Sequence, residues 1–217
     1  MAELQAVVFD LDGTLVDSLE DIAGAVNRVL TDLGRPCLSV EDYRPLVGWG
    51  LRQLVVSVTM EAPLAPDELE QAYQTVLKIY RAHPVVASRP YAGIADAVSA
   101  ISKKFPVAVL SNKEDEVTKA VVSTLFPSIP FRSVQGARPG VPHKPDPRAL
   151  LSLIADWGVP ASATAFLGDS EVDVQTALSA GCVPLGAGWG FRSPEDLKAA
   201  GAVEVFSTPA DFFKFIL

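Results

Sequence analysis

A short apolar run near the start of the chain, Ala6 to Phe9, is followed at once by two aspartates, Asp10 and Asp12. An uninterrupted apolar run of this length predicts a central strand of a parallel sheet, because helices cover both faces of such a strand. In open α/β sheets, ligands bind beyond the carboxyl ends of the strands. We therefore expect Asp10 to lie at the ligand-binding edge of a doubly wound, mainly parallel α/β sheet.

The spacing of the two aspartates predicts a pair of carboxylates on one side of the chain. Residues two apart in an extended segment project to the same side, and this applies to Asp10 and Asp12. Gly13 allows a close approach of the backbone to a ligand, and Thr14 adds a hydroxyl group. An acidic turn after a strand explains the same residues without any chemistry, so the pair alone leaves both interpretations open.

Length and charge limit the classes of protein that fit. The chain has 217 residues and a formal net charge of −8, which is enough for one α/β domain with a smaller insert. The negative charge argues against a nucleic-acid partner, because phosphate backbones require clustered Lys and Arg. We see no secretory leader pattern and no apolar run long enough to span a bilayer. We expect a cytoplasmic monomer or homodimer without membrane partners.

Helical periodicity dominates the chain after the first strand. No strand pattern interrupts residues 18–83, where apolar residues recur at helical spacing, and a capping box of Ser18 and Asp21 opens the first helix. A crossover between parallel strands needs only about a dozen residues. This long helical run therefore predicts an inserted subdomain. We expect a helical cap over residues 17–88 and an α/β core formed by residues 1–16 and 89–217.

Two further polar segments follow the alternating strands and helices of the second half. Ser111-Asn112-Lys113 comes directly after a strand predicted over residues 106–110, and its hydroxyl and N–H groups suit an anion. Lys144 lies in a loop stiffened by flanking prolines. A turn with a helix cap explains Ser111 and Asn112 equally well, and a solvated surface charge explains Lys144.

The segment Gly168-Asp169-Ser170-Glu171-Val172-Asp173 follows a strand predicted over residues 164–167. Asp169 and Asp173 are four residues apart, so they share one face of a starting helix. Their oxygens, with those of Asp10, are hard ligands that suit Mg²⁺. Ser170 and Asp173 also match a capping box, which accounts for them without a metal ion.

The chain resembles the haloacid dehalogenase-like superfamily over its whole length. The four motifs of that superfamily are matched in order by Asp10-x-Asp12-Gly13-Thr14, Ser111, Lys144-Pro145 and Gly168-Asp169-x-x-x-Asp173. The helical insert is similar to the cap of the phosphoglycolate phosphatase-like branch. Further likeness lies in the segments 47–52, 90–93 and 189–192. Serine instead of threonine before Asn112, and Ala92 instead of the commoner proline, are departures that leave the chemistry unaffected.

The resemblance implies a Rossmann-like core and a Mg²⁺-dependent phosphatase acting on a small phosphorylated metabolite, such as 2-phosphoglycolate. It implies that Asp10 attacks phosphorus to form an aspartyl-phosphate, and that Asp12 protonates the leaving alkoxide and later activates water. The implied phosphate-binding residues are Ser111, Asn112 and Lys144. The implied metal ligands are Asp10, Asp169, Asp173 and the backbone carbonyl of Asp12.

Within the predicted cap, Gly48-Trp49-Gly50-Leu51-Arg52 combines an aromatic surface with a guanidinium group that can bind a carboxylate. Trp49 and Arg52 are therefore candidate specificity residues. Packing of Trp49 inside the cap and a solvated Arg52 explain the same segment equally well.

Three other activities fit parts of this pattern. A dehalogenase has no alkoxide to protonate, so Asp12 argues against it. A sugar phosphomutase, an isomerase like β-phosphoglucomutase, uses the same aspartyl-phosphate and differs only in what the cap admits. A non-catalytic regulatory protein with the same fold is the third alternative, and an assay for phosphate release separates it from an enzyme.

Overall fold

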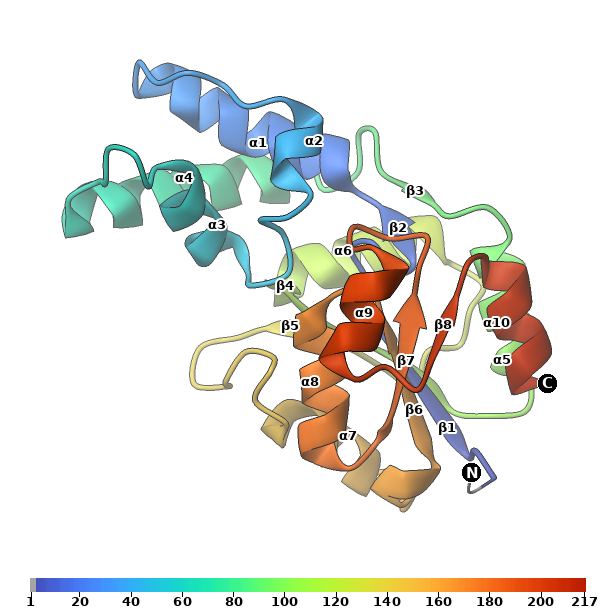
Figure 1. Ribbon diagram of the computed structural model, residues 1–217. Coiled ribbons are helices and arrows are strands. Elements are labelled where there is room, and N and C mark those ends of the chain that lie inside the picture. The colour runs from blue at the N-terminus through green and yellow to red at the C-terminus, as the bar shows by residue number, and fades with distance from the viewer. Residues whose placement is uncertain (1–2) are drawn as a thin grey trace.

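The structure is a computed structural model that describes residues 3–217, so residues 1 and 2 of the predicted core lie outside it. A six-stranded sheet with the order β5-β4-β1-β6-β7-β8 forms its centre (Figure 1). The strands are β1 (Ala6–Phe9), β4 (Val107–Glu114), β5 (Ser133–Ala137), β6 (Thr164–Gly168), β7 (Val183–Ala187) and β8 (Glu204–Phe206). Neighbouring strands in it pair in parallel. This confirms the predicted doubly wound α/β fold.

β1 lies at the point where the order of the strands reverses. The chain places β4 and β5 on one side of β1 and then returns to place β6, β7 and β8 on the other. All four residues of β1 are fully buried, as an apolar strand covered on both faces requires. Asp10 follows β1 directly, so it lies at the switch point where such sheets bind ligands.

Helices cover both faces of the sheet because successive side chains of β1 point to opposite faces. Val7 and Phe9 belong to one apolar cluster and Val8 to another. The first face is covered by α5 (Ile94–Ile101), α6 (Asp115–Leu125) and α10 (Pro209–Ile216). The second face is covered by α7 (Arg148–Ala155) and α8 (Glu171–Ala180), and α9 (Pro194–Ala200) packs against β7 and β8.

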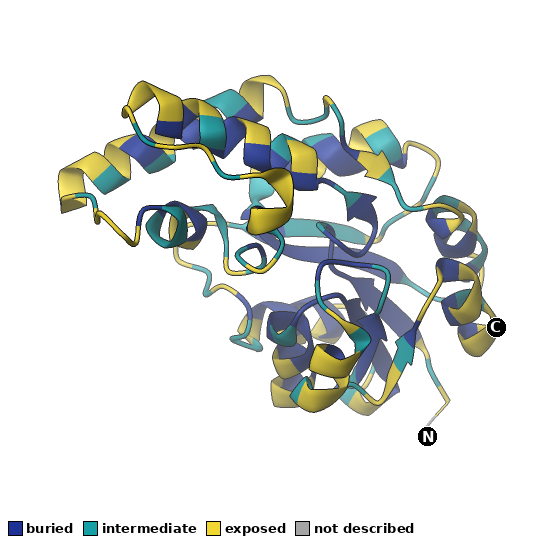
Figure 2. Ribbon diagram, turned by 45° about the horizontal axis from the view of Figure 1, so that its top comes forward, coloured by how far each residue is buried: buried dark blue, intermediate teal, exposed yellow. Residues whose placement is uncertain are grey.

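A layer of four helices lies beyond the carboxyl edge of the sheet, at the upper left of Figure 1. It consists of α1 (Leu19–Asp32), α2 (Val40–Tyr43), α3 (Leu51–Val58) and α4 (Pro66–Ala82). Figure 2 shows that α1 and α4 each bury one side and expose the other, which is the pattern of amphipathic helices. We call α1 to α4 the helical layer.

A two-stranded antiparallel ribbon, β2 (Val16–Asp17) with β3 (Arg89–Pro90), lies where the chain enters and leaves the helical layer. Its position coincides with the predicted cap boundaries. The independent movement of residues 17–88 as a cap stays a prediction.

The predicted capping box at the start of α1 is wrong. Ser18 is the N-cap residue, but its hydroxyl donates to Asp12 Oδ1 at 2.6 Å instead of bonding to its own helix. The Asp21 carboxylate accepts the backbone N–H groups of residues 86–88. These two side chains therefore tie α1 to the site and to the returning chain.

β4 is longer than predicted and continues to Glu114, past the predicted end at Leu110. Ser111, Asn112 and Lys113 are polar but buried, and the pairing of β4 with β5 shifts register between Leu110 and Glu114. Such irregularities change the direction of side chains next to functional sites. The polar residues after Leu110 are therefore part of the sheet edge rather than a surface turn.

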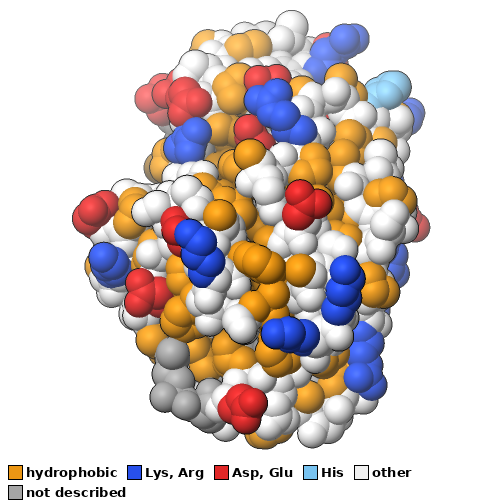
Figure 3. Space-filling view, turned by 90° about the vertical axis from the view of Figure 1, so that its right-hand side faces the viewer, with side chains coloured by type: hydrophobic (Ala, Val, Ile, Leu, Met, Phe, Trp, Pro, Cys, Tyr) orange, Lys and Arg blue, Asp and Glu red, His pale blue; other side chains and the backbone are white. Residues whose placement is uncertain are grey.

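Figure 3 shows the side of the molecule that carries α5 and α10. Apolar side chains are exposed there between separate acidic and basic ones, and the view shows no continuous basic stripe. None of the helices within residues 3–217 has the length and apolar character needed to cross a membrane.

Candidate active site

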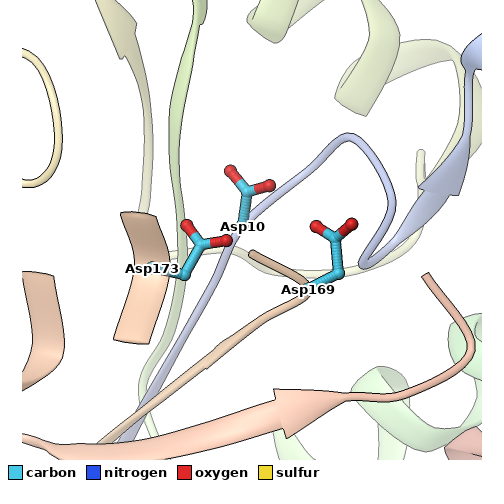
Figure 4. Close-up of side chains that lie close together, drawn as sticks. All are labelled: Asp10, Asp169 and Asp173. Atoms are coloured by element: carbon cyan, nitrogen blue, oxygen red, sulfur yellow. The ribbon is translucent and has the colours of Figure 1, made fainter. Parts of the chain in front are cut away.

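Three buried carboxylates converge at the carboxyl edge of the sheet, as Figure 4 shows. Asp10 follows β1, Asp169 follows β6, and Asp173 lies in the first turn of α8. One oxygen of each carboxylate lies within 4.8 Å of an oxygen of the other two. The structure thus brings together aspartates from opposite ends of the sequence.

Two glycines make room for this cluster. Gly13 has a φ of +84°, and a Cβ atom there would collide with the carboxylate of Asp169. A Cβ atom at Gly168 would collide with the side chain of Asp173. Both positions therefore require glycine. Gly13 is required because of its positive φ and the lack of room for a Cβ atom, and Gly168 because of the lack of room alone.

Hydrogen bonds orient the two aspartates that follow β6. Asp169 accepts the Thr14 hydroxyl at 3.3 Å and the Phe191 N–H at 2.8 Å. Asp173 Oδ2 accepts the Ser170 hydroxyl at 2.6 Å and so completes a capping box at the start of α8. The capping alternative is thus correct for Asp173, and its second oxygen still faces the other carboxylates.

Lys144 lies between two of these carboxylates. Its Nζ is 2.6 Å from Asp10 Oδ1 and 2.6 Å from Asp173 Oδ1, and the residue is 4% exposed. Burial acts to lower the pKa of the ammonium group, but Asp10 and Asp173 outweigh it and raise that pKa above its usual value. This placement contradicts the interpretation of Lys144 as a solvated surface charge.

The side chain of Asn112 holds the backbone around Lys144. Its amide nitrogen donates to the carbonyl oxygens of Lys144 and Gly48, at 3.0 and 2.9 Å, and its oxygen accepts the Lys144 N–H at 2.9 Å. These bonds occupy both amide protons, so the side chain positions Lys144 rather than offering donors to a phosphate. Ser111 differs, because its Oγ accepts the Lys113 N–H and its hydroxyl proton remains available to an anion.

A second buried lysine, Lys113, pairs with Asp12. Its Nζ lies 2.8 and 3.0 Å from the two carboxylate oxygens of Asp12 and 2.7 Å from the hydroxyl oxygen of Tyr80 in α4. Burial acts to lower the pKa of Lys113, but Asp12 and Tyr80 outweigh it and raise that pKa. No motif in the sequence predicts a role for Lys113 or Tyr80.

The carboxylate cluster is electrostatically unfavourable without a cation. Burial, partly offset by Lys144, raises the pKa of Asp10 to about 7. Burial and the neighbouring Asp173 and Asp10 raise the pKa of Asp169. Hard divalent cations prefer carboxylate oxygens, and an added positive charge would stabilise the ionised forms. Asp10, Asp169 and Asp173 therefore fit a divalent metal ion.

A cavity of about 60 Å³ lies between these residues and the helical layer. The edge of the sheet contributes the acidic and basic side chains described above. The helical layer and the loop before α3 contribute an apolar wall made of Ile22, Val47, Leu51, Leu54 and Leu77. A ligand at Asp10 is thus enclosed between a polar floor and an apolar roof.

Trp49 and Arg52 are not brought into this cavity. Trp49 is 41% exposed, and its indole N–H donates to Glu171 at 3.3 Å on the surface. The guanidinium of Arg52 lies 3.6 Å from Glu70, and both side chains are about half exposed. The placement of Arg52 agrees with the alternative of a solvated residue, and Trp49 is not packed inside the helical layer.

The chain is similar to known proteins along almost its whole length. Residues 4–181 match the haloacid dehalogenase-like hydrolase family. The phosphoglycolate phosphatase of Chromobacterium violaceum is 30% identical, covering 99% of this chain and 98% of that protein. That of Aquifex aeolicus is 32% identical, covering 98% and 97%. A crystal structure of a predicted phosphoglycolate phosphatase from Haemophilus somnus has a TM-score of 0.90 at 26% identity and covers 100% of both chains.

Proposed function

Because the chain belongs to the haloacid dehalogenase-like hydrolase family, we propose that it is a Mg²⁺-dependent phosphatase of small phosphate monoesters with Asp10 as nucleophile. The observation that carries this proposal is the setting of Asp10. Its carboxylate lies at the switch point of the sheet, 2.6 Å from Lys144 Nζ and beside the oxygens of Asp169 and Asp173. The activity of the relatives makes 2-phosphoglycolate the first substrate to test.

In the first half of the reaction, an oxygen of Asp10 bonds to phosphorus and the bond between phosphorus and the ester oxygen breaks. Asp12 gives a proton to that oxygen, so an alcohol leaves and an aspartyl-phosphate remains. Lys144 and the hydroxyl of Ser111 donate to the phosphoryl oxygens, where negative charge accumulates. These donors lie on the sheet side of the cavity.

In the second half, Asp12 takes a proton from a water molecule whose oxygen bonds to phosphorus. The bond from phosphorus to Asp10 breaks, which releases inorganic phosphate and restores both aspartates. Mg²⁺, held by Asp10, Asp169, Asp173 and the backbone carbonyl of Asp12, would neutralise charge on the phosphoryl oxygens and keep Asp10 ionised. The apolar wall limits the access of bulk water to the covalent intermediate.

The same wall argues against a sugar phosphomutase. A mutase has to hold a sugar whose several hydroxyl groups need hydrogen-bond partners. The helical layer offers the single hydroxyl of Tyr80, whereas Ile22, Leu51, Leu54 and Leu77 offer none. A purely regulatory role is disfavoured because the nucleophile, the second aspartate, the lysine and the acidic cluster are all present and converge on one cavity.

The test is an assay of phosphate release with Mg²⁺ and a panel of esters: 2-phosphoglycolate, sugar phosphates, nucleotides, pyrophosphate and an aryl phosphate. We expect release from at least one ester that depends on Mg²⁺ and disappears in Asp10→Asn. Asp156→Asn is the matched control, because Asp156 is exposed at the end of α7. Isomerisation of a sugar phosphate without release would identify a mutase, and no turnover of any ester would refute the proposal.

A further inference from the structure

The cavity contains two buried lysines, and the proposed reaction uses only one of them. Among the described residues that line the cavity, Lys113 and Lys144 are the basic ones. Lys144 is bound between Asp10 and Asp173 at the phosphoryl end. Lys113 is 7% exposed, and within residues 3–217 its ammonium group bonds to Asp12 and Tyr80 instead of these two aspartates. Its charge therefore faces a different part of a bound ester.

Lys113 lies on the side of the leaving group. Asp12 has to reach the ester oxygen within hydrogen-bond distance to protonate it. The ammonium group of Lys113 contacts both oxygens of that same carboxylate. An ammonium group has three donors, and here they are directed at the two Asp12 oxygens and the Tyr80 hydroxyl. When Asp12 carries the proton that it gives to the ester oxygen, the protonated oxygen no longer has to accept from Lys113, and one donor becomes available to a ligand group next to the ester oxygen.

Tyr80 adds a second donor at the same place. Its hydroxyl oxygen accepts from Lys113, which leaves its own proton for a ligand. Burial raises the pKa of Tyr80 to about 12, so the hydroxyl stays protonated at neutral pH. The Lys113 ammonium also lies 4.2 Å from the centroid of the Tyr80 ring, which favours this arrangement through a cation–π interaction.

The remainder of the wall does not suit an anion. Ile22, Leu51, Leu54 and Leu77 are apolar, and Arg52 is engaged with Glu70 outside the cavity. A negative group far from the ester oxygen would therefore meet hydrocarbon. A negative group one carbon away from that oxygen meets Lys113 and the Tyr80 hydroxyl.

We propose that Lys113 and Tyr80 form a subsite that binds a carboxylate on a short leaving group, one carbon removed from the ester oxygen. These two residues then select phosphorylated 2-hydroxy acids over neutral phosphate esters. The inference rests on the proposed phosphatase function and assigns its substrate selection to residues other than Trp49 and Arg52.

The direct test compares two phosphonates that cannot be hydrolysed. In 3-phosphonopropionate a methylene replaces the ester oxygen of 2-phosphoglycolate, and propylphosphonate has a methyl group in place of the carboxylate. We expect the wild-type protein with Mg²⁺ to bind the carboxylate compound roughly 10- to 100-fold more tightly, the scale of one charge-assisted hydrogen bond. Calorimetry should show this ratio falling to near unity in Lys113→Met and by several-fold in Tyr80→Phe. Tyr80→Phe keeps the Lys113–Asp12 pair, so it tests the subsite even if Lys113→Met fails to fold.

The control is Lys78→Met, which removes an exposed lysine two residues from Tyr80 on the same helix. Lys78→Met should leave the binding ratio unchanged. Lys113→Arg should retain part of the ratio that Lys113→Met loses. An unchanged ratio in both Lys113→Met and Tyr80→Phe would overturn the subsite, as would loss of the ratio in Arg52→Ala alone.

Kinetics separate a specificity role from a structural one. Lys113 also contacts Asp12, so turnover of both 2-phosphoglycolate and ethyl phosphate should fall in Lys113→Met, but kcat/KM for the carboxylate substrate should fall at least about tenfold further. Equal losses would make Lys113 only a support for Asp12 and overturn the subsite. No phosphate release by the wild-type protein from any ester would refute the phosphatase proposal instead, and the phosphonate measurement does not depend on turnover.

Discussion

The two buried lysines of the site differ in which parts of the molecule hold them. Lys144 lies between Asp10 and Asp173, and all three belong to the sheet and the segments attached to it. Lys113 lies between Asp12 at the sheet edge and Tyr80 in α4 of the helical layer. The phosphoryl end of the site is therefore complete without the helical layer, whereas the leaving-group end forms only where the two parts meet.

This difference separates the chemistry from the selection of the substrate. Changes in α4 can alter which leaving group is accepted without moving the nucleophile. The contacts between the core and the loop before α3 tolerate substitutions in that loop, because several of them bind its backbone carbonyl oxygens. Arg192 donates to the carbonyl oxygens of Arg44 and Val47, at 2.6 and 2.9 Å, and Asn112 donates to that of Gly48. Side chains of this loop can vary while the contacts remain.

The largest effect is expected from a substitution at the phosphoryl end of the site. Asp10→Asn keeps the shape of the side chain but removes the attacking oxygen anion, so activity should fall about 10,000-fold or more. The fold should remain, and the metal-free variant should melt at a higher temperature than the wild type because one buried charge is gone. Phosphate release and thermal denaturation measure the two effects. Turnover within about tenfold of the wild type would exclude the covalent mechanism.

Removal of the metal ion should have an effect nearly as large and act on the same end of the site. Excess EDTA should abolish activity, and Mg²⁺ or Mn²⁺ should restore it. Ca²⁺ should inhibit, because its larger and looser coordination displaces the reacting groups. Full turnover in excess EDTA would contradict the assignment of Asp10, Asp169 and Asp173 as metal ligands.

The two lysines should also differ in their contribution to stability. Lys144→Met leaves the two buried carboxylates of Asp10 and Asp173 without their shared cation, and breaking a buried ion pair costs about 3–5 kcal/mol of unfolding free energy. Lys113→Met should cost less, because the Ser18 hydroxyl still donates to Asp12 at 2.6 Å. Urea denaturation of both variants without metal provides the comparison. A larger loss in Lys113→Met would reverse our view of which end is the more strongly constrained.

The raised pKa of Asp10 predicts how the stability of the metal-free protein depends on pH. The folded state holds this proton up to about pH 7, whereas the unfolded chain releases it near 3.8. The folded state therefore binds more protons between these values, and its stability should decrease as the pH rises through this window. We expect the melting temperature to fall by a few degrees between about pH 5 and pH 7.5. Saturating Mg²⁺ or Asp10→Asn should reduce this dependence, and a melting temperature that rises over the window would contradict it.

The sequence predicts the sheet and the phosphoryl end because their signals are local. Apolar runs end at Asp10 and before Asp169, and the carboxyl ends of parallel strands lie at the same edge of the sheet. Lys113 was missed because the polar run after Leu110 suggested a turn, although these residues are buried in a continuing strand. Tyr80 reaches Lys113 only through the packing of α4 on the sheet edge, and no local pattern encodes that contact.

The smallest effect is expected from a substitution of Arg52, because its residue type suits a carboxylate but its side chain lies outside the cavity. The segment from Gly48 to Arg52 has the residues of a carboxylate-binding site, but its guanidinium pairs with Glu70 in solvent. Exposed ion pairs contribute about 0–1 kcal/mol. Arg52→Ala should therefore change the unfolding free energy by no more than about 1 kcal/mol, and the kcat/KM for 2-phosphoglycolate by no more than a few-fold. Steady-state kinetics with 2-phosphoglycolate and an aryl phosphate measure this, with Lys113→Met assayed in parallel. A selective loss of about tenfold or more in Arg52→Ala would mean that α3 turns Arg52 into the cavity when substrate binds, and selection would then belong to α3 rather than to Lys113 and α4.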